Sequence, residues 1–513
     1  MPIIIFNHRR DLRIEDNICL HKCLNIKNAI IIPVFFFDPK QIILNNANKH
    51  YFSSKSAYFV INSVMDLQKE YQNIGSNLLV LYDEPKKCLE IMIKMIKIIQ
   101  KYYNDDDIMF AYNKDFSKYS IIRDSSLNKI ANKNNIEIIN DDEMSDYCLI
   151  PWASMLKDLT NMLAYKQYGA YYKNALKTDV SLPQSIKKKE YNKFINKKIF
   201  DKIFNKKEFS DFESLMDPTL INSNSVEQWN TAGRSNCLAR LKNKSINNLK
   251  KYNADRDNLS YETSNISAYL NIGAVSIREI YIIFLKELGK NTQLIKQLYW
   301  RDFYLCALRY LPDGNEYHHM DTRYDNLKWS SYLIHTSNKF KLMEEYWKKM
   351  IDSKTGFLLI DAGMKQLKET GFLHGRLRMI IGTFWTKYLL IDIFDPKYGS
   401  QVGYSKYLVD AIGPSQNKMN HQWITEFDYP GKKYSAPNAP LSGRPMNIGN
   451  IQIKKFDKEC IYIKKWLPHL FDVPNKDLYK WSHEISKKYN NIHPEPIFDD
   501  KSKYKEWIEL CAL

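Results

Sequence analysis

The chain has 513 residues, 44% of them hydrophobic, which is enough for two or more domains with a sizeable core. Lysine and arginine number 75 against 58 acidic residues, and the net charge of +17 fits a nucleic-acid partner but does not require one. The eight cysteines form no Cys-x-x-Cys pair and no apolar run reaches membrane-spanning length, which argues against a zinc or iron–sulfur site and a membrane protein. We therefore expect an intracellular protein with reduced thiols, no metal and no membrane partner. Since Met1 leads directly into a strand-like run, we also expect no signal peptide.

Within the first 150 residues, short apolar runs alternate with segments of helical periodicity. Buried strands are predicted at 2–6, 29–37, 77–82, 108–112 and 136–139. Helices are predicted from about Ile18 onward and at 56–71, 86–102 and 117–132. Strands that alternate with helices in this way predict a parallel, doubly wound sheet.

The rest of the chain has a different pattern. Residues 151–225 carry weak periodicity and charge runs, and are predicted to form an interdomain connector with short helices. From residue 226 to 513 the pattern is helical almost throughout, ending in a short helix at 501–513. The predicted fold class is α/β plus all-α, with an N-terminal domain (1–150), the connector, and a larger helical domain (226–513).

The stretch Thr370–Asp392 has apolar residues at helical spacing, which predicts a core helix. His374, Arg376 and Arg378 nevertheless lie in its first half. A buried arginine needs an anion, which can be a carboxylate such as Asp410 or a ligand phosphate. From these residues alone, a core helix with one structural ion pair and a ligand site both remain open.

Two other stretches could bind a ligand. In the run 263–267 (TSNIS), hydroxyl and backbone N–H groups before a helix could donate to phosphate, although an ordinary N-cap explains the run equally well. Gln297, Trp300 and Arg301 are predicted on one helical face, where they suit stacking on a base. An aromatic core helix is the alternative. The stretch 353–366 is predicted to be a turn before a helix, too short in its Lys-Thr-Gly part for a P-loop.

Taken together and in this order, six stretches resemble the photolyase/cryptochrome family, close to its class I and (6-4) branches, over nearly the whole chain. They are FNHRRDLRIEDN (6–17), YETSNISAYLNIGAVSIRE (261–279), QLYWRDF (297–303), KTGFLLIDAGMKQL (354–367), TGFLHGRLRM (370–379) and FDKECIYIKKWLPHL (456–470). The resemblance implies an α/β domain, a helical domain that binds FAD, and a basic surface that receives UV-damaged DNA. It also admits a second antenna chromophore of unknown identity, although Ser117 stands where folate-binding members carry Glu.

By position, the resemblance assigns the FAD contacts. Those to the phosphates and ribose are Tyr252, Thr263, Ser264, Asn265, Ile266 and Ser267, with Asn265 where most members have Arg. Those lining the flavin are Phe372, Arg378, Asp410 and Asn417, with Gln297, Arg301 and His374 as further cofactor contacts. Arg378 and Asp410 would form the buried ion pair. Asn417 would face flavin N5 as in photolyases, where plant cryptochromes tend to have Asp and animal ones Cys.

The resemblance also assigns lesion and DNA contacts. The implied catalytic positions are Gln297, Trp300, Met379, Asn417 and Trp423, and the implied DNA-binding positions are Arg256, Trp300, Arg376 and Trp423. Cyclobutane-dimer enzymes usually carry Glu at Gln297 and Asn at Gly375, but Gln297 can still donate a hydrogen bond to a dimer carbonyl. The (6-4) enzymes need His at both Gly375 and Met379, and this chain has neither.

The family's electron-feeding tryptophan chain falls at His421, Ile393 and His335, none of which is Trp. Light-driven reduction of the flavin would then use other aromatic residues, such as Trp385 or Tyr388.

The resemblance thus implies light-driven DNA repair, with flavin-dependent electron transfer that splits cyclobutane pyrimidine dimers. The protein would be a deoxyribodipyrimidine photolyase, a carbon–carbon lyase that acts as a monomer. A cryptochrome-like blue-light photoreceptor without repair and a (6-4) photolyase remain as alternatives. A class I tRNA-synthetase-like adenylating enzyme would have a similar N-terminal sheet, but no KMSKS-like loop occurs.

Overall fold

The computed structural model describes residues 2–511 apart from 43–53, 104–106, 116, 142–144, 162, 166–167, 205–231, 243, 311–321, 400–446 and 450. The chain divides into two compact units. Unit 1 comprises Met1–Lys250 with Ser264–Tyr310, and unit 2 comprises Lys251–Thr263 with Leu311–Leu513. The predicted domain boundaries at 150 and 225 stay a prediction, because the two units do not distinguish a connector from the domains on either side of it.

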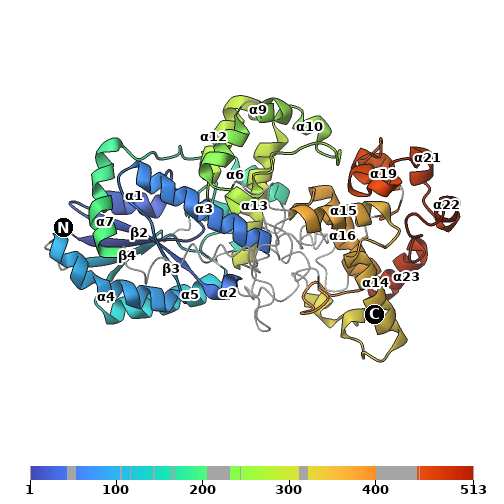
Figure 1. Cartoon of the computed structure of the whole chain (residues 1–513), viewed down its shortest axis with the longest axis horizontal. Helices are drawn as coiled ribbons and strands as arrows, with labels where there is room; N and C mark the ends of the chain where they lie inside the picture. Colours follow the sequence, from blue (N-terminus) through green and yellow to red (C-terminus); the bar gives the residue numbers. More distant parts are fainter. Residues whose placement is uncertain are drawn as a thin grey trace. The chain divides into compact units, whose positions relative to one another are not determined.

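Unit 1 contains the predicted parallel sheet. Its strands are β1 (Ile3–His8), β2 (Ile30–Phe37), β3 (Leu79–Tyr82), β4 (Ile108–Tyr112) and β5 (Glu137–Asn140), in the order β3-β2-β1-β4-β5. Each neighbouring pair is parallel, and β1 and β2 are buried along their whole length, as their uninterrupted apolar runs predict. The main sheet helices are α1 (Ile18–Leu24), α3 (Ser54–Asn73), α4 (Pro85–Tyr103) and α5 (Lys118–Lys133). Helices α4 and α5 pack against each other along one face of the sheet (Figure 1). The predicted fold class is confirmed.

The remaining elements of unit 1 are mostly short. They are α2 (Pro39–Ile42), η1 (Ser145–Tyr147), η2 (Trp152–Met155), β6 (Leu156–Asp158), β7 (Leu163–Ala164), α6 (Tyr168–Ala175), η3 (Lys188–Lys193), α7 (Lys197–Phe204), α8 (Arg234–Leu241), α9 (Lys244–Leu249), α11 (Ser267–Asn271), α12 (Ile277–Leu288) and α13 (Gln293–Tyr310). Strands β6 and β7 pair antiparallel, and the periodicity of the connector did not predict them.

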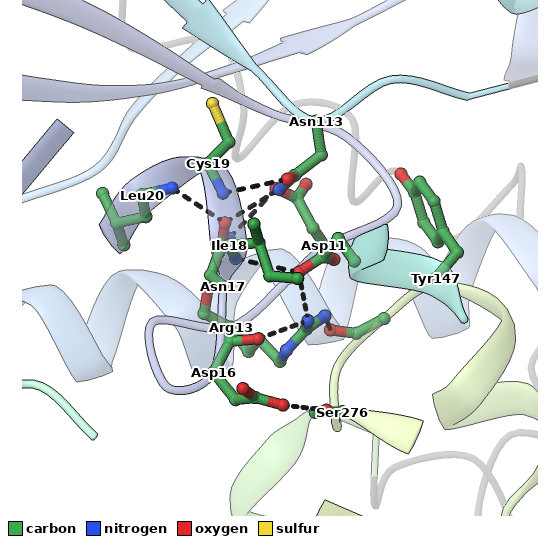
Figure 2. A network of polar contacts seen from close by, with 12 residues as sticks. Asp11, Arg13, Asp16, Asn17, Ile18, Cys19, Leu20, Asn113, Tyr147 and Ser276 are labelled. Carbon is green, nitrogen blue, oxygen red and sulfur yellow. Dashed lines mark hydrogen bonds and ion pairs between the residues drawn. The ribbon is translucent and has the colours of Figure 1, made fainter. Parts of the chain in front are cut away.

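A buried polar network fixes the segment that follows β1 (Figure 2). The Asp11 carboxylate accepts hydrogen bonds from the side-chain amides of Asn17 (3.0 Å) and Asn113 (2.6 Å). Asn17 also caps α1 by accepting from the Leu20 amide, and the Asn113 oxygen accepts from the Cys19 amide at 3.1 Å. The amide side chains thus satisfy a buried carboxylate and the start of a helix together.

Arg13 extends this network toward the second half of unit 1. Its guanidinium donates to the Asp146 carboxylate (2.7 Å), the Asp16 carbonyl (2.8 Å) and the Gly273 carbonyl (3.0 Å). Gly273 has φ +66°, and a Cβ there would lie 2.1 Å from the Arg10 carbonyl oxygen, so only glycine fits. The FNHRRDLRIEDN motif therefore joins the sheet to the segment before α12.

A second arginine completes the connection. The Asp16 carboxylate accepts from Arg278 at 2.9 Å and from the Ser276 hydroxyl, at the start of α12. Both side chains of the Arg278–Asp16 pair are buried. This buried pairing explains why residues 264–310 belong to the same compact unit as the sheet.

Unit 2 is helical in its described parts. Its elements are α10 (Tyr252–Asp255), η8 (Thr322–Asn326), η9 (Ser330–Tyr332), α14 (Asn338–Ile351), α15 (Leu358–Thr370), α16 (Gly375–Thr383), the π-helical turn η10 (Phe384–Tyr388), α19 (Ile451–Phe456), α20 (Ile461–Trp466), η11 (Pro468–Leu470), α21 (Asn475–Leu478), α22 (His483–Lys488) and α23 (Asp500–Cys511). Helix α15 packs against α16 and α20 in a continuous apolar core.

The single core helix predicted at 370–392 is wrong in its bounds. Helix α15 ends at Thr370 because Gly371 adopts the left-handed conformation (φ 68°), which closes a helix. The chain restarts as α16 at Gly375, with His374 as N-cap, and continues into η10 as far as Tyr388. The apolar positions are buried as predicted, but His374 lies before the helix rather than within it.

All eight cysteines are free and buried, as expected for reduced thiols. None of the helices in the described ranges is long and apolar enough to cross a membrane.

Candidate functional site

The N-terminus of α16 carries the charged residues that the sequence singles out. His374 caps the helix, because its Nδ1 accepts a hydrogen bond from the Arg376 amide at 3.2 Å. Burial, together with the charges of Arg376 and Arg378, lowers the pKa of His374 to about 4. At neutral pH the imidazole is therefore neutral, as an Nδ1 acceptor must be.

Arg378 lies in the first turn of α16 and is buried. Its Nε donates to the Leu373 carbonyl at 2.8 Å, and its guanidinium lies 5.8 Å from the centre of the half-buried Phe372 ring. A buried guanidinium needs an anionic or carbonyl oxygen as partner, and an aromatic ring beside it can pack on a planar group, so these two side chains suit a flavin cofactor. The predicted partner Asp410 lies outside the described residues, so the Arg378–Asp410 pair stays a prediction.

Arg376 has a carboxylate partner of its own. Its Nε and Nη2 both lie 2.8 Å from Oδ1 of Asp257, and its Nη1 donates to the Met379 sulfur at 3.7 Å. Arg256, the neighbour of Asp257, is half-buried with its Nε 3.9 Å from the same oxygen. The two predicted DNA-binding arginines thus lie close together in unit 2, around the Asp257 carboxylate, for which no role was predicted from the sequence.

In unit 1, helix α13 presents Gln297 and Trp300 three residues apart, and both side chains are half-buried. The indole of Trp300 stacks on Tyr168 of α6, with ring centroids 3.6 Å apart and planes 6° apart. The Tyr168 hydroxyl donates to the Lys296 carbonyl at 3.1 Å, which holds the tyrosine against α13. The indole also contacts Phe303 and Tyr304, with ring centroids 5.7 and 5.6 Å away. These contacts fix the orientation of Trp300, and the stack on Tyr168 was not predicted from the sequence.

Arg301, the next residue of α13, contacts the backbone near η1. Arg301 donates to the Tyr147 carbonyl and lies 3.7 Å from its neighbour Asp302. Asp302 is fully buried and accepts from the Leu149 amide at 2.7 Å. Arg301 is thus held by unit 1's own backbone, while its assignment as a cofactor contact stays a prediction.

Asp302→Asn should change how the stability of the protein depends on pH. Burial raises the pKa of Asp302 to about 7, although Arg301 opposes the shift. Because the folded-state pKa lies above the unfolded value, Asp302 contributes stability that is present below about pH 4 and lost as the pH rises through about 7. Thermal midpoints at pH 5 and pH 7.5 measure this: the variant should gain relative to the parent chain as the pH rises. An unchanged difference between the two proteins would contradict the assignment.

The residues predicted to contact the FAD phosphates and ribose are divided along the chain between the two units. Tyr252 and Thr263 belong to unit 2, where Tyr252 is half-buried in α10, and residues 264–267 belong to unit 1. Asn265 adopts a positive φ of 49°, and Ile266 is the N-cap of α11 without a side-chain hydrogen bond to the helix.

Several predictions fall on residues that the structure does not describe. These are Asp410, Asn417, His421 and Trp423. Of the remaining tryptophan-chain positions, Ile393 is buried and His335 stacks on Phe340 with ring centroids 4.4 Å apart. Trp385 is fully buried, and its indole N–H donates to the Tyr398 carbonyl at 2.6 Å.

Comparisons with known proteins identify relatives of the whole chain. Residues 4–187 match the DNA photolyase family pattern, and residues 294–512 match the FAD binding domain of DNA photolyase. The deoxyribodipyrimidine photo-lyase of Buchnera aphidicola subsp. Baizongia pistaciae is 26% identical, with 97% of this chain and 96% of that protein covered. The enzyme of the same name from Alkalihalophilus pseudofirmus is 27% identical, with 98% and 96% covered.

Solved structures show the same likeness. An archaeal photolyase from Sulfolobus tokodaii, crystallised with two FAD molecules, is 26% identical, covers 99% of each chain and superposes with a TM-score of 0.73. A cryptochrome from Synechocystis is 20% identical with a TM-score of 0.75 over 99% of each chain, which shows a shared fold. Two matched domains span most of the sequence, and full-length relatives share its architecture. The chain therefore belongs to the photolyase/cryptochrome family and carries that family's FAD-binding domain.

Proposed function

We propose that the protein is a DNA photolyase that splits cyclobutane pyrimidine dimers in UV-damaged DNA. The observation that carries the proposal is the face of α13 on which Gln297 lies one turn before Trp300. A half-buried indole, fixed by its stack on Tyr168, offers a rigid apolar surface to a flipped base. The amide of Gln297 offers a donor to a dimer carbonyl at the same face. The full-length similarity to deoxyribodipyrimidine photo-lyases supports this reading.

The remaining residues take roles in binding and positioning. Arg256 and Arg376 contact the DNA at or beside the lesion. Met379 and Trp423 form part of the wall against which the dimer packs. FAD is held by Tyr252, Thr263, Ser264, Asn265, Ile266, Ser267, Arg301, Phe372, His374, Arg378, Asp410 and Asn417. Bound FAD in its reduced form would supply the light-driven electron that opens the cyclobutane ring and would take that electron back once the ring has opened. The side chains exclude water, orient the dimer and hydrogen-bond the charge that develops on it.

A cyclobutane dimer fits these residues better than a (6-4) product. Gly375 and Met379 carry no proton donor at the positions where (6-4) enzymes need histidines. His374 does not replace them as a proton donor. Its pKa of about 4 means that the imidazole is neutral, not protonated, at neutral pH. A repair reaction that needs no protonated imidazole is therefore the better match.

We also propose that the protein acts as a monomer inside the cell, and that a second chromophore serves as antenna. The structure from Sulfolobus tokodaii, whose second FAD is described as a light-harvesting cofactor, is a precedent in a relative of similar length.

Gln297→Leu should reduce light-driven repair about a hundredfold, a size typical of the removal of one donor to developing negative charge. Dimer binding should fall much less, since Trp300 and the arginines remain. Single-turnover repair and gel-shift affinity on the same dimer-containing duplex measure the two effects separately. Gln297→Glu is the matched control, because it keeps the size and introduces the residue usual in cyclobutane-dimer enzymes. Equal loss of binding and repair in Gln297→Leu would overturn the assignment of Gln297.

A further inference from the structure

The Arg376–Asp257 ion pair is held by two short contacts rather than one. One oxygen of Asp257 receives both the Nε and the Nη2 of Arg376, each at 2.8 Å, so a whole edge of the guanidinium is fixed. Burial opposes the charge of the Asp257 carboxyl, but the hydrogen bond and charge of Arg376, with the charge of Arg256, outweigh it and lower the pKa. Asp257 is therefore a carboxylate at neutral pH.

The backbone on both sides of this contact is anchored. The Arg376 amide donates to His374, which fixes the start of α16. Two residues after Asp257, the amide of the buried Leu259 donates to the Phe456 carbonyl of α19 at 2.8 Å. The carboxylate thus stands on a turn that unit 2 holds in place, rather than on a freely moving loop.

The other edge of the guanidinium remains available. Nη1 of Arg376 contacts only the weak acceptor sulfur of Met379, at 3.7 Å, among the contacts described for it. The Arg376 side chain is 29% exposed, so a DNA phosphate can reach it. With its Nε edge on Asp257, Arg376 keeps its remaining N–H groups on the opposite edge, beside Met379, and its guanidinium carbon lies 5.8 Å from the centre of the Phe456 ring.

We propose that Asp257 is a positioning residue for lesion recognition, which orients Arg376 so that its free edge meets the DNA backbone at the dimer. This inference rests on the proposed function, since it takes Arg376 as a contact to damaged DNA. A fixed guanidinium matches one phosphate position, which the distorted backbone around a flipped dimer provides. Undamaged DNA is held by charge alone and gains nothing from this orientation.

The test is Asp257→Ala, measured as the affinity of the FAD-loaded protein for one duplex with and without a single cyclobutane dimer. We expect the dimer affinity to fall about threefold to tenfold, as for a lost hydrogen-bonded charge pair at a partly exposed site. The affinity for undamaged DNA should stay equal or rise, because the protein loses one negative charge. Asp257→Glu, which keeps the carboxylate, should recover part of the dimer affinity.

Asp255→Asn is the matched control, since it removes the same charge two residues away without contact to Arg376. Its two affinities should change in parallel. If Asp257→Ala strengthens both affinities together, Asp257 acts only through its charge and the inference is wrong. If both fall together, Asp257 only supports the fold and the inference is equally wrong. If the parent chain shows no preference for the dimer, the proposed function itself fails, which is a different result.

Discussion

Arg13→Leu should lower the free energy of unfolding of unit 1 by about 3 to 5 kcal/mol, the cost of breaking a buried ion pair from one side. The substitution removes the Arg13 guanidinium from the buried Asp146 carboxylate, which keeps only the Ile18 amide and the more distant Arg278, at 3.9 Å. It also removes the Arg13 donors to the Asp16 and Gly273 carbonyls. Arg13 and Asp146 are 1% and 0% exposed, so water cannot replace the lost hydrogen bonds.

Urea unfolding, followed by circular dichroism, measures this effect. Lys197→Ala is the control, because it removes an ion pair with Asp201 in which both side chains are about half exposed. That pair should contribute less than about 1 kcal/mol. A loss in Arg13→Leu no larger than in the control would show that the network contributes little to stability, and that the motif at residues 6–17 has another role.

Trp300→Ala should weaken binding of a dimer-containing duplex by about 1 to 3 kcal/mol, the range measured for loss of one aromatic stacking partner of a base. That corresponds to roughly a fivefold to 140-fold increase in the dissociation constant. Undamaged duplex should bind almost as before, since phosphate contacts dominate there and Trp300 carries no charge.

Two companion variants separate stacking from structure. Trp300→Phe keeps an aromatic ring and should retain most of the dimer affinity. Tyr168→Leu removes the ring that stacks on Trp300 at 3.6 Å and should have an intermediate effect, because the indole remains but is less fixed. If Trp300→Ala weakens damaged and undamaged DNA equally, Trp300 is a core residue of α13 rather than a lesion contact.

The sheet could be predicted from sequence because its signal is local. The run at 108–112 is apolar and bounded by polar residues, and β4 occupies the same residues. The prediction of one helix at 370–392 was wrong for an equally local reason. Its apolar spacing continues across Gly371, but a left-handed glycine and the His374 cap divide it into α15 and α16. Glycine after a helical run is a stop signal, and it could have been used.

The contacts that shape the candidate site could not be predicted in this way. Tyr168 and Trp300 are far apart in the sequence, as are Asp257 and Arg376, and no periodicity relates them. Asp257 could only have been noticed as a carboxylate beside Arg256, in a stretch already considered for phosphate binding. The roles assigned to Asn417 and Trp423 remain predictions, because both lie outside the residues that the structure describes.

An anaerobic repair assay would show whether the protein splits cyclobutane dimers in light. The purified, FAD-loaded and chemically reduced protein is mixed with oligonucleotides that carry either a cyclobutane dimer or a (6-4) product, in blue light and in darkness. We expect light-dependent restoration of the cyclobutane substrate alone. Flavin-loaded protein that repairs neither lesion would contradict the account and favour a photoreceptor, and repair of the (6-4) product would contradict the reading of Gly375 and Met379.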